Sequence, residues 1–129
     1  MSKLNNAAMV YLEREFGPRV TFDATERTLY SHDIAAMPGL VKPLIGNTTP
    51  AAIVQPENSE ELVKVVKLAV SYGIPLTPRA KASSGYGGVL PVKQGLVVDF
   101  FRMNRVLKID REALTATVEA GIVWEKIDA

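Results

Sequence analysis

Cysteine is absent from this chain of 129 residues, and histidine occurs once, as His32. The absence of cysteine excludes disulfides, thiolate nucleophiles, cysteine-ligated zinc and iron–sulfur clusters built from these residues. A single histidine cannot supply a multi-histidine metal site, so we expect no metal. The formal net charge is only +1, which provides no strong field for binding nucleic acid or an anionic membrane.

Long hydrophobic runs are also missing. No apolar run approaches the roughly 20 residues that span a bilayer, and the N-terminus lacks the hydrophobic segment of a secretory signal. We therefore expect a cytoplasmic protein without a transmembrane segment, or one attached peripherally to the inner face of the membrane. Hydrophobic residues make up 47% of the chain and charged residues 22%, an ordinary composition for one folded domain.

Residues 1–49 predict an N-terminal helix followed by a connecting segment. Apolar and aromatic residues spaced along one helical face predict a helix over residues 3–16, and Gly17-Pro18 provides its stop. These residues are Leu4, Ala8, Tyr11 and Leu12. Residues 20–35 give no clear pattern. Residues 36–50 contain three prolines and two glycines, which predicts a loop.

Residues 50–129 predict a small mixed β-sheet flanked by helices, an α+β fold with α/β-like features. Runs rich in β-forming residues predict the strands. They lie at residues 51–54, 74–77, 96–100, 106–109 and 115–119. A helix is predicted between the first two strands, with Asn58 as its cap and Gly73 at its left-handed end. Its apolar face is predicted to comprise Leu62, Val65, Val66 and Ala69.

The end of the chain predicts an amphipathic helix that starts near Ile122. The pattern continues to Ala129 without a cap and is shorter than the helices usual in globular proteins. This favours a domain that continues in a longer protein.

A stretch of small residues, from Arg79 to Gly88, directly follows a predicted strand. Small side chains let backbone N–H groups approach an anion closely, hydroxyl groups add donors, and Arg79 and Lys81 add charge suited to a diphosphate. The residues expected to bind are Arg79, Ala80, Lys81, Ala82, Ser83, Ser84, Gly87 and Gly88. The stretch matches neither the Walker A loop nor G-x-G-x-x-G. It is therefore either a third type of diphosphate cradle or a flexible surface turn.

Three further residues, Asp99, Trp124 and His32, are predicted to have structural rather than functional roles. Asp99 is predicted to face the solvated side of the sheet rather than to be a buried partner of a cation. Trp124 is predicted to pack in the core or on a helix face rather than on an adenine. His32, beside Asp33 in a turn, is predicted to be structural rather than a general base. No residue is assigned as catalytic.

Short segments of the chain occur in the same order as the motifs of a known family. They are Tyr30-Ser31-His32-Asp33, Pro50–Pro56, Gly73-Ile74-Pro75, Pro78-Arg79, Gly87–Pro91, Gly95–Asp99, Arg102–Val106, and Thr117–Gly121 before Trp124. On these segments the chain resembles the FAD-binding domain of the vanillyl-alcohol oxidase/p-cresol methylhydroxylase superfamily. Within it, the resemblance is closest to the FAD subunit of glycolate oxidase and the related D-lactate dehydrogenases.

The resemblance implies the first lobe of a two-lobed FAD-binding domain, with residues 50–129 ending before the second lobe. It implies an FAD-linked oxidoreductase that oxidises a 2-hydroxy acid, such as glycolate or D-lactate, by hydride transfer to flavin. The substrate pocket would lie in the missing parts, so this chain alone would be inactive. Oxygen, a quinone or an iron–sulfur partner would accept the electrons. A lobe without its partner leaves apolar surface open to self-association.

The loop departs from the family's usual Arg-Gly-Gly-Gly-Thr. Ala80, Lys81 and Ala82 stand where the family has glycines, and Ser83 replaces the threonine. Alanine and lysine pay a steric cost at positive φ. Either the loop holds the diphosphate along an altered path, or the chain is a non-catalytic binding or assembly module with a degraded flavin site. Some members bond flavin covalently through a histidine in this loop; none is present here, so FAD would be non-covalent.

Overall fold

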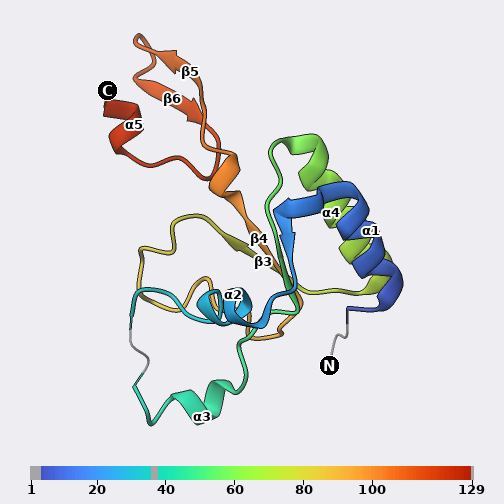
Figure 1. The fold of residues 1–129 in the computed structure, drawn as a ribbon. Coiled ribbons are helices and arrows are strands. Elements are labelled where there is room, and N and C mark those ends of the chain that lie inside the picture. The colour runs from blue at the N-terminus through green and yellow to red at the C-terminus, as the bar shows by residue number, and fades with distance from the viewer. Residues whose placement is uncertain (1–3, 36–37, 129) are drawn as a thin grey trace.

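A four-stranded sheet forms the centre of the fold, and a two-stranded hairpin extends from it (Figure 1). The computed structural model describes residues 4–35 and 38–128. The elements in chain order are α1 (Asn6–Phe16), η1 (Gly17–Arg19), β1 (Val20–Thr21), α2 (Ala24–Leu29), α3 (Lys42–Ile45), β2 (Ala52–Val54), α4 (Ser59–Tyr72), β3 (Leu76–Arg79), β4 (Leu96–Asp99), η2 (Phe100–Arg102), β5 (Val106–Asp110), β6 (Thr115–Val118) and α5 (Glu125–Asp128). The predicted small mixed sheet flanked by helices is confirmed.

The first helix is confirmed from Asn6 to Phe16, but Leu4 and Asn5, which were also expected to be helical, precede it. The Asn5 side chain caps α1 by accepting a hydrogen bond from the N–H of Ala8 at 2.8 Å, and Gly17 ends the helix with φ +51°. Residue 3, where the helix was expected to start, lies outside the described residues. Residues 20–35 gave no prediction; they form β1 and α2, and the Asp23 carboxylate caps α2.

The predicted loop at residues 36–50 contains a short helix, so the prediction was wrong over Lys42–Ile45. Proline is favoured in the first turn of a helix, where its missing N–H has no intrahelical partner. Pro43 occupies such a position in α3. Residues 36 and 37 of the same stretch are outside the described part.

The strand order of the sheet is β1-β2-β4-β3. Strands β2 and β3 both pair in parallel with β4, whereas β1 is antiparallel to β2. The predicted strand–helix–strand unit is therefore present, although β3 begins at Leu76 rather than at residue 74. Because three parallel strands are neighbours, their carboxyl ends lie at the same edge of the sheet.

The main core lies between the sheet and the helices α1 and α4, which lie next to each other in Figure 1. Buried residues of this core include Leu12, Val65, Leu68, Ala69 and Leu96. The predicted face of α4 is confirmed at Val65 and Ala69, but Val66 is 41% exposed and Leu68 is buried instead. The segment before residue 50 belongs to the same packed unit, because α1 shares this core and β1 pairs with β2.

The C-terminal part extends away from this core. Strands β5 and β6 form an antiparallel hairpin at the predicted positions, and most of their residues are exposed. Trp124 is 81% exposed, so its predicted packing in the core or on a helix face was wrong. Within the described residues, the helix expected from Ile122 is only the single turn α5, which starts after Trp124. Ala129, the last residue of the expected helix, lies outside the described residues. Among the described residues, no helix has the length and apolar character needed to cross a membrane.

Two glycines with similar positive φ values provide a test of the close packing of the backbone. Gly17 has φ +51° and open space where a Cβ would lie, whereas a Cβ on Gly95, at φ +55°, would collide with the Pro75 carbonyl oxygen. Gly17→Ala should cost about 1–3 kcal/mol, because φ +51° with ψ −124° is a conformation that L side chains rarely adopt. Gly95→Ala should cost at least about 2 kcal/mol more, because backbone atoms must move. Urea unfolding measures both losses, and equal losses would contradict the close approach.

Candidate functional site

The loop from Ala80 to Gly88 begins where β3 ends, at the carboxyl edge of the parallel strands. Ligands of parallel sheets characteristically bind outside this edge. Positive φ values occur in the loop at Ala82 (54°), Gly85 (69°) and Gly87 (79°). These conformations turn the chain repeatedly, so the loop follows a compact path beside the strand ends.

The loop presents a continuous run of free backbone donors. Within the described part of the chain, the N–H groups of residues 81–86 donate no hydrogen bond. The side chains of Ser83 and Ser84 are exposed beside them. Backbone N–H groups in such a series bind anions, phosphates above all. The chemistry of this donor set fits a diphosphate.

Ala82 occupies one of the positions where glycine was expected. It is 9% exposed and takes φ +54°, a conformation that costs a non-glycine residue about 1–2 kcal/mol. The loop thus keeps a glycine-like path at this position in spite of the substitution. The Lys81 ammonium lies 4.5 Å from the centroid of the Phe101 ring, so it sits at the edge of the loop over an aromatic face.

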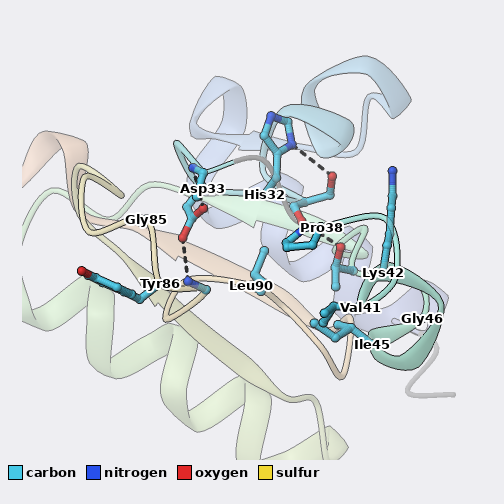
Figure 2. A pocket seen from close by; sticks show the side chains of 14 residues that line it. His32, Asp33, Pro38, Val41, Lys42, Ile45, Gly46, Gly85, Tyr86 and Leu90 are labelled. Carbon is cyan, nitrogen blue, oxygen red and sulfur yellow. Dashed lines mark hydrogen bonds between the residues drawn. The ribbon is translucent and has the colours of Figure 1, made fainter.

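The segment Tyr30–Asp33 is bonded to the strand ends and the loop at three points. The Tyr30 hydroxyl donates to the Asp99 carboxylate at 2.6 Å. Arg79 donates to the backbone carbonyl of His32 at 2.8 Å, and its guanidinium lies 5.0 Å from the centroid of the Tyr30 ring. The N–H of Gly87 donates to the Asp33 carboxylate at 2.8 Å (Figure 2). Arg79 is therefore turned toward this segment.

Asp99 is buried, so its predicted solvated position was wrong. Besides the Tyr30 hydroxyl, its carboxylate accepts hydrogen bonds from the Gln55 side-chain amide at 2.8 Å and from the N–H of Phe101 at 3.0 Å. Central strands of parallel sheets are covered on both faces, and β4 is buried throughout. Burial of the phenol, followed by the bond to Asp99, raises the pKa of Tyr30 to about 12.

Asp33 is also buried, at 8% exposure. One carboxylate oxygen accepts from Gly87 N–H, and the other accepts from the N–H of Ala35 at 3.0 Å. These bonds, that from Gly87 first, lower the pKa of Asp33 below its ordinary value. Sequence reasoning gave no function to Tyr30 or Asp33, although both fall within the Tyr-Ser-x-Asp segment.

A cavity of about 630 Å³ adjoins the loop (Figure 2). Its lining residues fall within 31–35, 38–48 and 85–90. Its lining combines apolar side chains with polar and cationic ones: Val41, Ile45 and Leu90 with Ser31, His32 and Lys42. In the described part of the chain, no cluster of three or more histidine, aspartate or glutamate side chains is arranged to hold a metal ion.

A loop of small residues with backbone donors at the carboxyl edge of parallel strands is typical of nucleotide-binding domains. The family described as "FAD binding domain" matches residues 50–129. Since this match spans more than half of the chain, the chain belongs to that family, and FAD is the cofactor of the domain.

Known proteins with similar sequences include two FAD-linked enzymes. The glycolate oxidase subunit GlcD of Bacillus subtilis is 36% identical over 74 residues, which are 57% of this chain and 16% of that protein. The mitochondrial D-lactate dehydrogenase [cytochrome] of Kluyveromyces lactis is 29% identical over 85 residues, 64% of this chain and 15% of that protein.

The fold is also similar to solved structures. A structure of alkyldihydroxyacetonephosphate synthase superposes with a TM-score of 0.76 and 28% identity, covering 92% of this chain and 25% of that chain. These comparisons confirm the resemblance inferred from the ordered segments. They also show that this chain spans only about a sixth of the length of the curated relatives.

The raised pKa of Tyr30 leads us to expect a specific loss of stability in alkaline solution. Since the pKa rises from 10.0 to about 12 on folding, the neutral phenol's contribution is complete below pH 10 and disappears as the pH passes through 12. In Tyr30→Phe, the free energy of unfolding should therefore fall less steeply over this range than in the unchanged protein.

Urea unfolding between pH 10 and 12 measures these slopes. Tyr72→Phe, a change of an exposed tyrosine, is the matched control and should keep the steep fall. An equally steep fall in Tyr30→Phe would contradict the buried bond to Asp99.

Proposed function

We propose that this chain is the diphosphate-binding part of an FAD-linked oxidoreductase that oxidises a 2-hydroxy acid such as glycolate or D-lactate. The observation that carries the proposal is the run of N–H groups at residues 81–86 that have no acceptor among the described residues and lie beside the carboxyl ends of three parallel strands. Bound FAD supplies a two-electron acceptor for the hydride. The glycolate oxidase and D-lactate dehydrogenase relatives support the choice of substrate class.

The loop residues divide into donors and residues that determine its path. The N–H groups of residues 81–86 and the hydroxyls of Ser83 and Ser84 bind the diphosphate. Ala80 and Gly88 keep the approach open, because their side chains are small or absent. Gly87 acts on the shape of the loop, since its N–H is bonded to Asp33.

Arg79 and Lys81 both place positive charge at the N-terminal end of this cradle. Within the described part of the chain, Arg79 donates one hydrogen bond, to the His32 carbonyl, and its other N–H groups would meet a phosphate oxygen. The cavity next to Gly85 provides apolar and polar walls for the remainder of FAD. FAD is held without a covalent bond, because no histidine occurs in the loop.

The chain acts as the first lobe of a two-lobed domain, with residues 50–129 forming most of it and residues 1–49 adding its first helix and connection. Support comes from the share of the relatives that it matches. The exposed hairpin adds further support. Leu107 and Ile109 are 57% and 58% exposed, and an isolated two-stranded hairpin is marginally stable at best in water. Substrate and catalytic groups then belong to other parts of the protein.

A second candidate function is a non-catalytic module with a degraded flavin site. The strained Ala82 favours it, because the same loop with glycine would bind without this cost. Binding of FAD by the full-length protein decides between the two functions.

Removal of the Arg79 charge should weaken FAD binding. Losing a charge-assisted hydrogen bond costs about 1.5–3 kcal/mol, so we expect Arg79→Ala to raise the Kd for FAD about ten- to a hundredfold. Calorimetric titration of the full-length protein measures this, with Arg111→Ala in the exposed hairpin turn as the matched control. An unchanged Kd for Arg79→Ala would exclude this residue from the site.

The substrate class is tested by adding D-lactate or glycolate to the FAD-loaded protein without oxygen. We expect the visible absorbance of the flavin to bleach as it is reduced. Bound FAD that none of several 2-hydroxy acids reduces would contradict the substrate class, while an inability to bind FAD would support the degraded module.

The exposed hairpin face should make this 129-residue chain self-associate when it is prepared alone. A charge at Ile109 should oppose this, so Ile109→Lys is expected to sediment as a smaller species than the unchanged chain. The control is Arg111→Lys, which keeps its charge. Monomeric behaviour of the unchanged chain at high concentration would argue against an uncovered partner surface.

A further inference from the structure

We propose that Asp33 is a positioning residue, which holds the FAD loop in its binding conformation through the N–H group of Gly87. The inference rests on the proposed function, because it assigns a role toward the same loop. It adds a residue that lies outside that loop, 54 positions before Gly87 in the sequence.

The carboxylate of Asp33 joins two backbone segments. Its Oδ2 accepts from Gly87 N–H at 2.8 Å, and its Oδ1 accepts from Ala35 N–H at 3.0 Å. With the side chain buried at 8% exposure, both oxygens are directed at backbone donors rather than at solvent. Carboxylate bonds to N–H groups are short and strong, and these two bonds, that from Gly87 first, lower the pKa of Asp33.

The hydrogen bond between Asp33 and Gly87 fixes the chain directly after residues 81–86, whose N–H groups have no acceptor in the described part of the chain. At the near end, Arg79 is held in the sheet by pairing with Asp99. Beyond Gly87, the N–H of Leu90 donates to the Gly87 carbonyl and forms the next turn. Residues 81–86 lie between these fixed points and donate no backbone hydrogen bond of their own within the described chain. Their positions therefore depend on the two ends.

Asp33 is itself firmly placed. The Tyr30 hydroxyl is bonded to Asp99 at the end of β4, and the His32 carbonyl is bonded to Arg79 at the end of β3. Segment 30–33 is thus attached to two strand ends before it reaches the loop. A loop that is ordered before binding loses less conformational entropy when FAD binds.

The test compares three variants of the full-length protein by titration with FAD and with ADP, which shares the diphosphate. Asp33→Ala removes both bonds and should raise both Kd values about tenfold. Asp33→Asn keeps one acceptor oxygen and should give an intermediate loss. Asp110→Ala is the matched control: it removes a carboxylate that caps a backbone N–H in the hairpin turn, and it should leave both Kd values unchanged.

Amide hydrogen exchange separates positioning from a general loss of structure. Without ligand, Asp33→Ala should exchange faster at Gly87 and Leu90, whose N–H groups are hydrogen-bonded in the unchanged protein, while the amides of the central sheet keep their protection. Saturating FAD should slow exchange at residues 81–86, whose N–H groups gain acceptors. Faster exchange throughout the sheet would overturn the proposal in favour of a merely structural role.

The two proposals fail in different ways. If the unchanged protein binds FAD and ADP and Asp33→Ala binds them equally tightly, only the role of Asp33 is wrong. If the unchanged protein binds neither, the proposed function is wrong and the positioning role falls with it.

Discussion

The parallel pairing of β4 with both β2 and β3 is the constraint on which the rest of the structure depends. Because β4 lies between these strands and is buried along its whole length, three strand ends meet at one edge of the sheet. Gln55, Arg79 and Asp99 follow or end these strands. Each of them therefore contributes a polar group to the same small region, and the loop after β3 must begin there.

This edge contains a buried carboxylate, Asp99, that forms no ion pair with any of the described residues. It is satisfied instead by the Tyr30 hydroxyl, the Gln55 amide and the Phe101 N–H. A buried charge is tolerated when hydrogen bonds replace its lost hydration. The consequence for the site is that Tyr30 is drawn against the strand ends. His32 and Asp33 lie two and three positions later in the sequence. The His32 carbonyl accepts a hydrogen bond from Arg79, and the Asp33 carboxylate accepts one from the N–H of Gly87 in the loop.

Local signals in the sequence were sufficient for the main elements. Asn58 caps the start of α4, and Gly73, in the left-handed conformation, ends it. Both residues form their hydrogen bonds with residues three or four positions away, so a local pattern is enough to predict them. The position of the loop could also be predicted, because small residues after a strand are a local pattern. The one-turn helix α3 was missed, since four residues carry too little periodicity to outweigh the prolines and glycines of the same stretch.

The partners of polar side chains could not be predicted in this way. Asp99 meets Tyr30 across 69 positions of sequence, and Gly87 meets Asp33 across 54. Neither pairing follows from composition or spacing. The exposure of Trp124 likewise depends on the hairpin extending away from the core, which is a property of the tertiary arrangement. Charge made Arg79 and Lys81 candidate binding residues, but it could not predict the aromatic rings of Tyr30 and Phe101 that lie beside them.

The central claim is that the free N–H groups of residues 81–86 bind the diphosphate of FAD. A crystal structure of the full-length protein with FAD tests it most directly. We expect phosphate oxygens within hydrogen-bonding distance of several of these N–H groups, with Gly87 still bonded to Asp33. A diphosphate bound elsewhere, with the loop donors facing only water, would contradict the account.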